Sequence, residues 1–211
     1  MREITVTEGL RELKLYDAKI NKAINKANLV IAAKKSEDIL KQIGKTKKEF
    51  KDEAKAEYIS IKDLIENRAK LKAAIVNSNA KTKVTIDGVK MTVAEAIERK
   101  SSIEYEQTLL KKLKSAYEKA NDLVSYNNDK VDNKVDELIK TMVGKDTTKM
   151  SKEDQDKITN GYRENNEWDI VDPIEIRKEI DKLEERIDGF LANVDVQLSL
   201  SNSTTFIKLE D

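Results

Sequence analysis

Residues 84–95 read VTIDGVKMTVAE, and this stretch predicts how the two longest helices are connected. The residues on either side of Asp87-Gly88 are rich in valine, isoleucine and threonine, which favour strands. The Asp-Gly pair itself favours a two-residue β-hairpin turn, because both central residues of that turn adopt positive φ. The stretch therefore predicts a β-hairpin over residues 84–91.

A helix start follows the hairpin directly. Thr92 and Glu95 have the spacing of a capping box, in which the hydroxyl and the carboxylate each bond a backbone N–H. From Val93 to about Val124, apolar residues recur every three or four positions, which predicts a long helix. A further apolar stripe with the same spacing ends at Gly144.

Another long helix is predicted before the hairpin. From about Lys47 to Ile75 the chain has no glycine or proline, and its apolar residues keep the helical spacing. Residues 77–80, NSNA, are expected to stop this helix because asparagine and serine compete for backbone hydrogen bonds. Since a short connector joins the two long helices, they are expected to lie antiparallel.

Nearer the ends of the chain the signals are shorter. Thr7 is predicted to cap a first helix whose apolar stripe begins at Leu10. Residues 29–33, LVIAA, indicate a short strand or a buried turn. Asp172 and Pro173 predict the start of the last helix, because aspartate is a good cap and proline fits the first helical position.

Two further segments complete the predicted organisation. Residues 128–170 are interpreted as an irregular insert, rich in asparagine and aspartate. Residues 192–209 predict a C-terminal β-hairpin, since 194–200 alternate between apolar and polar residues and 204–209 can return as a second strand. These strands are expected to share one small sheet with residues 84–91.

Together the patterns predict a mainly α protein. Long antiparallel helices would form a coiled-coil-like bundle, with short β-hairpins at the tips. Residues 1–211 are interpreted as a single elongated helical domain. Charged residues make up 38% of the chain, as expected where narrow helical rods bury only one stripe each.

The composition removes several kinds of chemistry. The chain has no cysteine and no histidine, so it can form no disulfide and no thiolate or imidazole metal site. Asp129, Asp132 and Asp136 lack the glycine-centred spacing of a calcium loop. No glycine-rich phosphate loop occurs, and paired carboxylates are read as solvated helix faces. We therefore expect no enzyme activity, no metal and no cofactor.

Location and partners follow from hydropathy and charge. No apolar run is long enough to span a membrane, and the first residues do not resemble a signal peptide, so a cytoplasmic protein without membrane contact is predicted. Nucleic acid is disfavoured because no basic block is free of acids. Residues 1–120 carry 27 basic and 18 acidic side chains (+9), whereas residues 121–211 carry 13 and 22 (−9). Either chance on solvated faces or attraction between the two parts explains this asymmetry.

The segment NSNA, the strand that follows it and DGVKMTVAEAIERK resemble the middle of the septicolysin-like proteins of bacteria and phages. The matching positions, which are sharpest over residues 77–105, are Asn79, Asp87, Gly88, Thr92, Val93, Glu95, Ala96, Ile97, Glu98, Arg99, Thr204 and Thr205. Residues 128–170 have no counterpart in that family. The resemblance implies a helical, oligomeric protein and implies no particular mechanism.

Polar residues at the predicted element ends are the candidate ligand-binding residues. They are Arg99, Asn77, Asn79, Asn202, Thr204 and Thr205. Arginine offers five fixed donors that suit phosphate or carboxylate. The other side chains serve either as caps and turns or as the walls of a polar pocket where hairpin, helix start and C-terminal strands meet.

Three functions are compatible with these residues. The favoured one is a non-enzymatic oligomeric protein that sequesters a small phosphorylated or nucleotide-like ligand, as phage anti-defence sponge proteins do. The alternative is a structural coiled-coil scaffold or virion-associated protein without a ligand. A membrane-acting lytic protein is the weakest alternative, because no segment is apolar enough to insert.

The sequence also predicts a partner, namely a second copy of the chain. Leu64, Leu109, Leu123 and Ile139 lie beside the main apolar stripes, where one antiparallel helix pair cannot bury them. Contiguous exposed apolar side chains usually mark an interface. We therefore expect a symmetric homo-oligomer, either a dimer or a larger closed ring.

Overall fold

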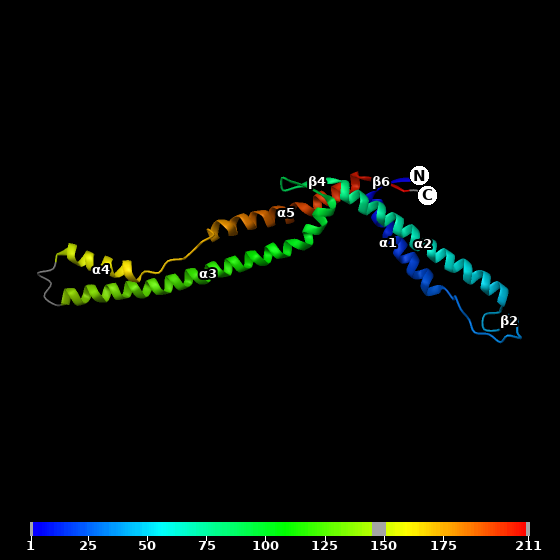
Figure 1. Cartoon of the computed structure of the whole chain (residues 1–211), viewed down its shortest axis with the longest axis horizontal. Coiled ribbons are helices and arrows are strands. Elements are labelled where there is room, and N and C mark those ends of the chain that lie inside the picture. The colour runs from blue at the N-terminus through cyan, green and yellow to red at the C-terminus, as the bar shows by residue number, and fades with distance from the viewer. Residues whose placement is uncertain (1, 145–150, 210–211) are drawn as a thin grey trace. The chain divides into compact units, whose positions relative to one another are not determined.

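A computed structural model describes residues 2–144 and 151–209 of the chain, and these residues form five helices and six short strands (Figure 1). The helices are α1 (Val6–Lys26), α2 (Lys47–Lys81), α3 (Val93–Gly144), α4 (Lys152–Asn166) and α5 (Ile176–Thr204). The strands are β1 (Arg2–Thr5), β2 (Ile39–Leu40), β3 (Lys45–Thr46), β4 (Lys83–Ile86), β5 (Val89–Thr92) and β6 (Phe206–Leu209). The prediction of a mainly α protein with short hairpins is confirmed.

The hairpin predicted over residues 84–91 is present. Strands β4 and β5 pair antiparallel, and the turn residues Asp87 and Gly88 have φ values of 50° and 73°. The predicted capping box is present as well: the Thr92 backbone N–H donates to Glu95 Oε2 at 2.6 Å, and the Glu95 N–H donates to Thr92 Oγ1 at 3.1 Å. Short-range sequence signals therefore sufficed to predict this connection.

The contacts divide the chain into two compact units rather than the single domain predicted for residues 1–211. Unit 1 comprises Met1–Ser101 and Gly189–Asp211, and unit 2 comprises Ser102–Asp188. Helices α3 and α5 each contribute residues to both units.

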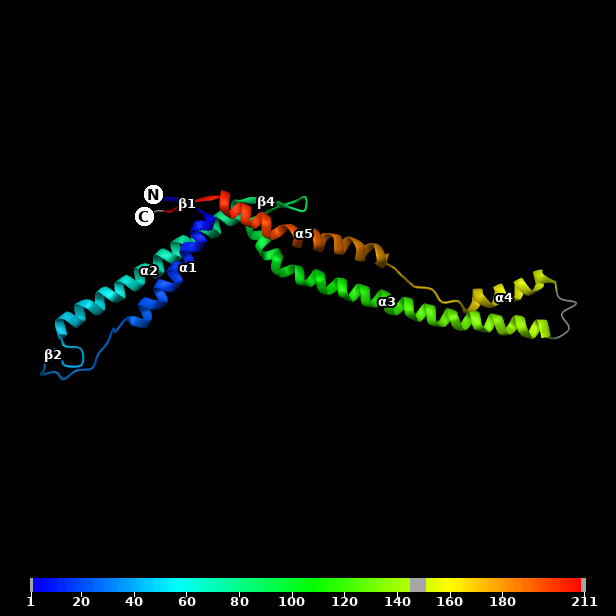
Figure 2. The same ribbon diagram turned by 180° about the vertical axis from the view of Figure 1, so that it is seen from behind.

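In unit 1, α1 and α2 lie side by side (Figures 1 and 2). Strand β1 pairs antiparallel with β6, with Ile4 opposite Ile207. The buried core contains residues of both helices and of β6, namely Val6, Leu13, Leu71, Ile75 and Ile207. The two ends of the chain therefore complete the core of this unit.

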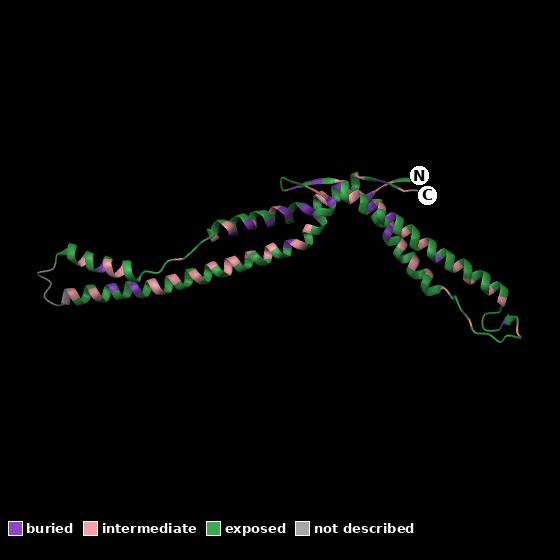
Figure 3. Ribbon diagram, in the orientation of Figure 1, coloured by how far each residue is buried: buried purple, intermediate pink, exposed green. Residues whose placement is uncertain are grey.

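In unit 2, α4 and the first half of α5 lie alongside α3 (Figures 1 and 2). Lys114 of α3 forms an ion pair with Glu184 of α5, and Arg186 Nε lies 3.1 Å from Glu106 Oε2. Val131 and Val135 of α3 are buried. Exposed and half-buried residues nevertheless cover most of the helical surface (Figure 3).

The long helices have other neighbours than expected. The sequence predicted that the helices before and after the hairpin would form a pair. Instead, α1 packs along α2, whereas α4 and α5 contact α3. Most of α3 belongs to unit 2, and α1 supplies the apolar face that α2 needs.

Two predicted helix boundaries and one predicted strand were wrong. Helix α1 is capped by Thr5 and not by Thr7, because only Thr5 has a glutamate, Glu8, three residues later. Residues 77–80 do not stop α2, which continues to Lys81, because the small helix propensity cost of asparagine and serine is outweighed by tertiary context. Residues 29–33 form no strand, and Val30 is largely exposed.

The last helix also begins later than predicted. Glu175 adopts a φ of 53°, which interrupts a helix at Asp172-Pro173. The Asp172 carboxylate instead accepts from the N–H groups of Ile174 at 3.2 Å and Ile176 at 2.8 Å. Helix α5 therefore starts at Ile176.

Residues 128–170 are not an irregular insert where the structure describes them. Helix α3 continues to Gly144 because its apolar stripe keeps the helical spacing, and α4 begins after Ser151, whose side chain accepts from Asp154 N–H. Most of the described asparagine and aspartate residues of this segment occupy exposed helix positions. Residues 145–150 lie outside the described part of the chain.

The predicted hairpin over residues 192–209 was wrong in its first strand. Val194 is 1% exposed and Val196 is 65% exposed, so the two do not share a face as they would in a strand. Val194 instead continues the buried stripe of Ile187 and Phe190 at helical spacing, within α5. Strand β6 does form, but it pairs with β1, and β4 and β5 make a separate sheet.

No helix within the described residues is long and apolar enough to cross a membrane.

Candidate functional site

A groove of about 720 Å³ lies between the C-terminal half of α2 and strand β6. From α2 it is lined by Lys70, Ala73, Ala74, Asn77, Ser78 and Lys81, which recur at helical spacing and so occupy one face. Thr82 and residues 205–209 form the other wall. All of these residues belong to unit 1.

Small side chains explain why the groove is open. Ala73 and Ala74 fill little space on α2, opposite the strand. Strand β6 pairs only with β1 among the described strands, and Thr205 O accepts from Val6 N–H at 2.9 Å. Because backbone groups alternate in direction along an antiparallel strand, those of Phe206 and Lys208 point to the edge that β1 leaves free. The groove therefore offers backbone as well as side-chain hydrogen-bonding groups.

Among the described residues, the charges that line the groove are all positive. Lys70, Lys81 and Lys208 contribute ammonium groups, and no described lining residue carries a carboxylate. Lys70 Nζ lies 3.0 Å from Glu66 Oε1, an exposed pair that solvent screens. The C-terminal end of the α2 dipole disfavours an anion by up to about 1 kcal/mol. The positive charges of the three lysines act against this effect and make the groove suitable for an anion.

The structure brings only two of the predicted ligand residues together. Asn77 and Thr205 both line the lysine-bearing groove. Asn79 is half-buried on α2 but lies about 200° around the helix from Asn77, outside the groove. Thr204 is still helical, and its hydroxyl donates to Leu200 O at 2.9 Å, as a residue in the last turn of a helix often does.

Arg99 occupies a different place in unit 1. Its guanidinium carbon lies 4.7 Å from the centre of the Phe190 ring, and Phe190 is buried. A guanidinium over an aromatic face is held by a cation–π interaction of about 0.5–2 kcal/mol. Through this contact, Arg99 of α3 binds to Phe190 of α5, which gives Arg99 a structural role.

Asn202 lines a second groove of unit 1, of about 560 Å³. Its other lining residues are Thr7, Leu10, Arg11, Lys14, Ile97, Asp195, Leu198 and Ser199. Asp195 Oδ1 lies 2.5 Å from Lys100 Nζ, so its charge is already paired. Leucine and isoleucine contribute much of this lining, which makes it a poorer anion site than the first groove.

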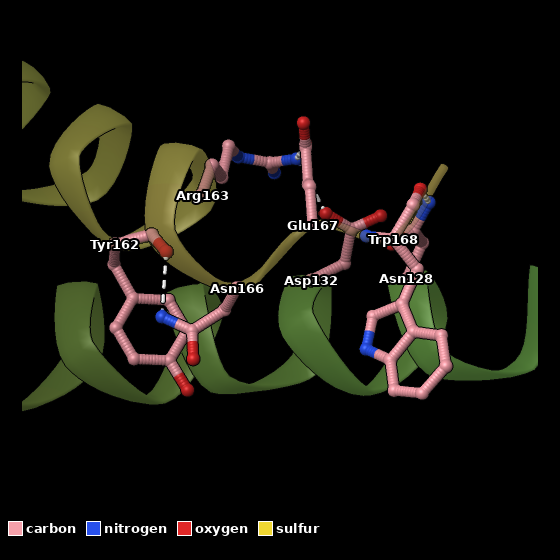
Figure 4. A network of polar contacts seen from close by, with 7 residues as sticks. All are labelled: Asn128, Asp132, Tyr162, Arg163, Asn166, Glu167 and Trp168. Carbon is pink, nitrogen blue, oxygen red and sulfur yellow. Dashed lines mark hydrogen bonds and ion pairs between the residues drawn. The ribbon is translucent and has the colours of Figure 1, made fainter. Parts of the chain in front are cut away.

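A polar network links α4 to α3 in unit 2 (Figure 4). Arg163 Nη1 lies 2.6 Å from Asp132 Oδ1 and 3.4 Å from Glu167 Oε1. Asp132, one of the three aspartates considered as metal ligands, therefore has a cationic partner. Over residues 2–144 and 151–209, no three acidic side chains gather in a way that could hold a metal ion.

The lysines of the groove were missed by sequence reasoning. Lys70, Asn77 and Lys81 share one face of α2, and this spacing was a usable signal once the helix was known to continue to Lys81. Lys208 gave no such signal, because its position beside α2 depends on the pairing of β6 with β1. A comparison of the chain with protein families, curated protein sequences and solved structures found no match.

Proposed function

We propose that the protein is a non-enzymatic binding protein of the cytoplasm, which acts as a homo-oligomer and holds a small phosphorylated or nucleotide-like ligand in the groove between α2 and β6. The observation that carries this proposal is that Lys70, Lys81 and Lys208 line the groove, with no carboxylate among its described lining residues. The volume of about 720 Å³ is within the range of small-molecule sites.

The neutral residues of the groove support the same ligand chemistry. Asn77, Ser78, Thr82 and Thr205 supply amide and hydroxyl groups beside the lysines. Ammonium groups bind phosphate as point charges, and hydroxyl or amide donors fix its orientation. Phe206, which is exposed, and Leu209 also line the groove and add apolar surface that suits a base. Sequestration of a nucleotide-like signal, as in phage anti-defence sponges, is the biological role that we favour.

The test compares binding to the parent protein and to matched variants. Calorimetry with adenosine diphosphate and inorganic pyrophosphate should show binding, and Lys81→Ala/Lys208→Ala should weaken it at least about tenfold, the effect of losing about 1.5 kcal/mol of charge-assisted hydrogen bonding. Lys72→Ala removes an exposed lysine of α2 outside the groove and should leave the affinity unchanged. Absence of binding, or equal weakening by Lys72→Ala, would overturn the proposal.

A scaffold without a ligand is the second candidate, because apolar side chains remain exposed on α3. Leu109 and Leu123 are each about half exposed. Mass spectrometry of small molecules released by heating protein purified from its host distinguishes the two. A released phosphorylated compound supports the ligand-binding role, whereas none, together with normal assembly, supports the scaffold.

A further inference from the structure

A second stripe of residues follows the exposed side of α3 within unit 2. Its members are Tyr105, Leu109, Lys112, Ala116, Lys119, Leu123 and Tyr126, spaced 4, 3, 4, 3, 4 and 3 residues apart. This is the heptad spacing of a helix that packs against another helix. Tyr105 is 80% exposed, Leu109 52%, Leu123 51% and Tyr126 59%, so no element within the described chain covers the stripe.

The stripe is separate from the face of α3 that packs inside unit 2. That inner face carries Glu106, Lys114, Tyr117 and Asn128, which contact Arg186, Glu184, Arg177 and Trp168 in α5 and the segment before it. At 100° per residue, Ala116 lies about 100° around the helix from Tyr117. Within unit 2, helix α3 therefore has one face that packs against α5 and the segment before it, and a second face, the stripe, that no described residue covers.

The order of residue types along the stripe is symmetric. Read from Tyr105 or backwards from Tyr126, it gives Tyr, Leu, Lys, Ala, Lys, Leu, Tyr, with Ala116 at the centre. A twofold axis through Ala116 would place Leu109 opposite Leu123 of a second copy. Such self-complementarity is what an isologous interface requires, and an unrelated partner helix would not require it.

We propose that α3 of a second copy of this chain docks antiparallel on this stripe, with the two Ala116 residues facing each other at a twofold axis. The inference rests on the homo-oligomer of the proposed function and specifies its contact, and it does not depend on the ligand groove, which lies in unit 1.

The small residue at the centre of the stripe fits this occupant, and acidic residues beside the stripe can balance its lysines. Ala116 and the absence of a bulky side chain at the centre let the two backbones approach closely. The two leucines and two tyrosines would leave water, and the removal of their apolar surface from solvent favours the association. Lys112 would face Lys119 of the second copy, and Glu118 and Asp122 lie within one turn of Lys119. The lysine stems can cover apolar surface while the ammonium groups reach these carboxylates.

The absence of cysteine permits a geometric test by single substitutions in the full chain. Ala116→Cys should form a disulfide-linked dimer under mild oxidation, because Cα atoms at the axis can reach the about 4.4–6.8 Å that a disulfide needs. Tyr105→Cys alone should not, since its copies would lie roughly 33 Å apart along the axis. Tyr105→Cys mixed with Tyr126→Cys should form the mixed dimer.

Ser125→Cys is the matched control, an exposed position of α3 outside the stripe, and it should yield only traces of dimer. In reducing buffer, light scattering should give at least twice the monomer mass, and Leu109→Glu/Leu123→Glu should lower that mass while circular dichroism stays helical. No more dimer from Ala116→Cys than from Ser125→Cys would overturn the proposal. So would self-linkage of Tyr105→Cys, which indicates a parallel pair, or an unchanged mass for the double glutamate variant.

Discussion

The side chain of Asn128 holds the backbone of Trp168 through both of its polar atoms (Figure 4). Asn128 Nδ2 donates to the Trp168 carbonyl at 3.0 Å, and Asn128 Oδ1 accepts from the Trp168 N–H at 2.8 Å. The Asn128 amide thus bonds both backbone groups of Trp168, as a neighbouring strand would. The segment between α4 and α5 is thereby fixed to α3 at its first residues.

Asn128→Asp should loosen this attachment. The carboxylate can still accept from Trp168 N–H, but it cannot donate to the Trp168 carbonyl, so at least one hydrogen bond worth about 1 kcal/mol is lost. Amide hydrogen exchange in α4 should become faster by about fivefold. Asn127→Asp is the control, because Asn127 Nδ2 bonds only its own helix, at Leu123 O. Equal acceleration in both variants would contradict the assigned role.

Gly189→Ala should destabilise unit 1. A Cβ at this position would lie 2.2 Å from Asp87 Oδ2, closer than any contact between such atoms. The clashing atoms belong to the exposed Asp87 carboxylate, which must turn away, and the higher helix propensity of alanine offsets part of that cost. We therefore expect a net loss of at most about 1 kcal/mol in the free energy of unfolding, measured by urea denaturation. Asp87→Gly removes the clashing side chain and keeps the positive φ of the turn, so Gly189→Ala should cost less than half as much in that background. The same cost in both backgrounds would show that the clash is not its cause.

Stability should fall in acid partly through the capping box of α3. The Thr92 backbone N–H, and then the Thr92 hydroxyl, hold the pKa of Glu95 below its ordinary value of 4.5. Because the folded pKa is the lower one, the stabilisation is fully present above the unfolded pKa and is lost as pH falls through the folded pKa. Glu95→Gln cannot titrate, so its thermal midpoint should decline less than that of the parent between neutral pH and pH 3. Parallel declines would argue against this contribution.

Ile207→Ala should be among the most damaging single changes in unit 1. Ile207 is 4% exposed and belongs to the core with Val6 and Ile75, so its truncation should cost about 2–5 kcal/mol. Its neighbour Phe206 is 60% exposed, and Phe206→Ala should cost far less. Urea unfolding of both variants provides the measurement. Similar losses for the two would mean that β6 does not contribute to the core as described.

The elements that were predicted correctly are those whose signals are local. Asp87-Gly88 and the pair Thr92/Glu95 lie within a few residues of the structures that they produce. Residues 194–200 were misread because Val-Asp-Val-Gln-Leu-Ser-Leu alternates over too few residues to exclude a helix. The preceding stripe through Ile187 and Phe190 carried the deciding information.

The candidate site was harder to predict because it joins distant segments. Asn77 and Thr205 were singled out separately, and the structure brings both to one groove. What joins them is the pairing of β6 with β1, for which no short-range pattern exists in either strand. Arg99 was singled out for the chemistry of its guanidinium, whereas its environment, the Phe190 ring, depends on α5 being helical there.

The pairing of β1 with β6 has a consequence for the order in which the protein folds during synthesis. Arg2 is paired with Leu209, so strands about two hundred residues apart must meet. At 5–20 residues per second, α1 and α2 would leave the ribosome roughly 6 to 25 seconds before β6 does. During that interval Val6 and Ile75 have no Ile207 to pack against. Helices α1 and α2 of the nascent chain therefore emerge with an unfinished apolar surface, which stays exposed until β6 has been synthesised.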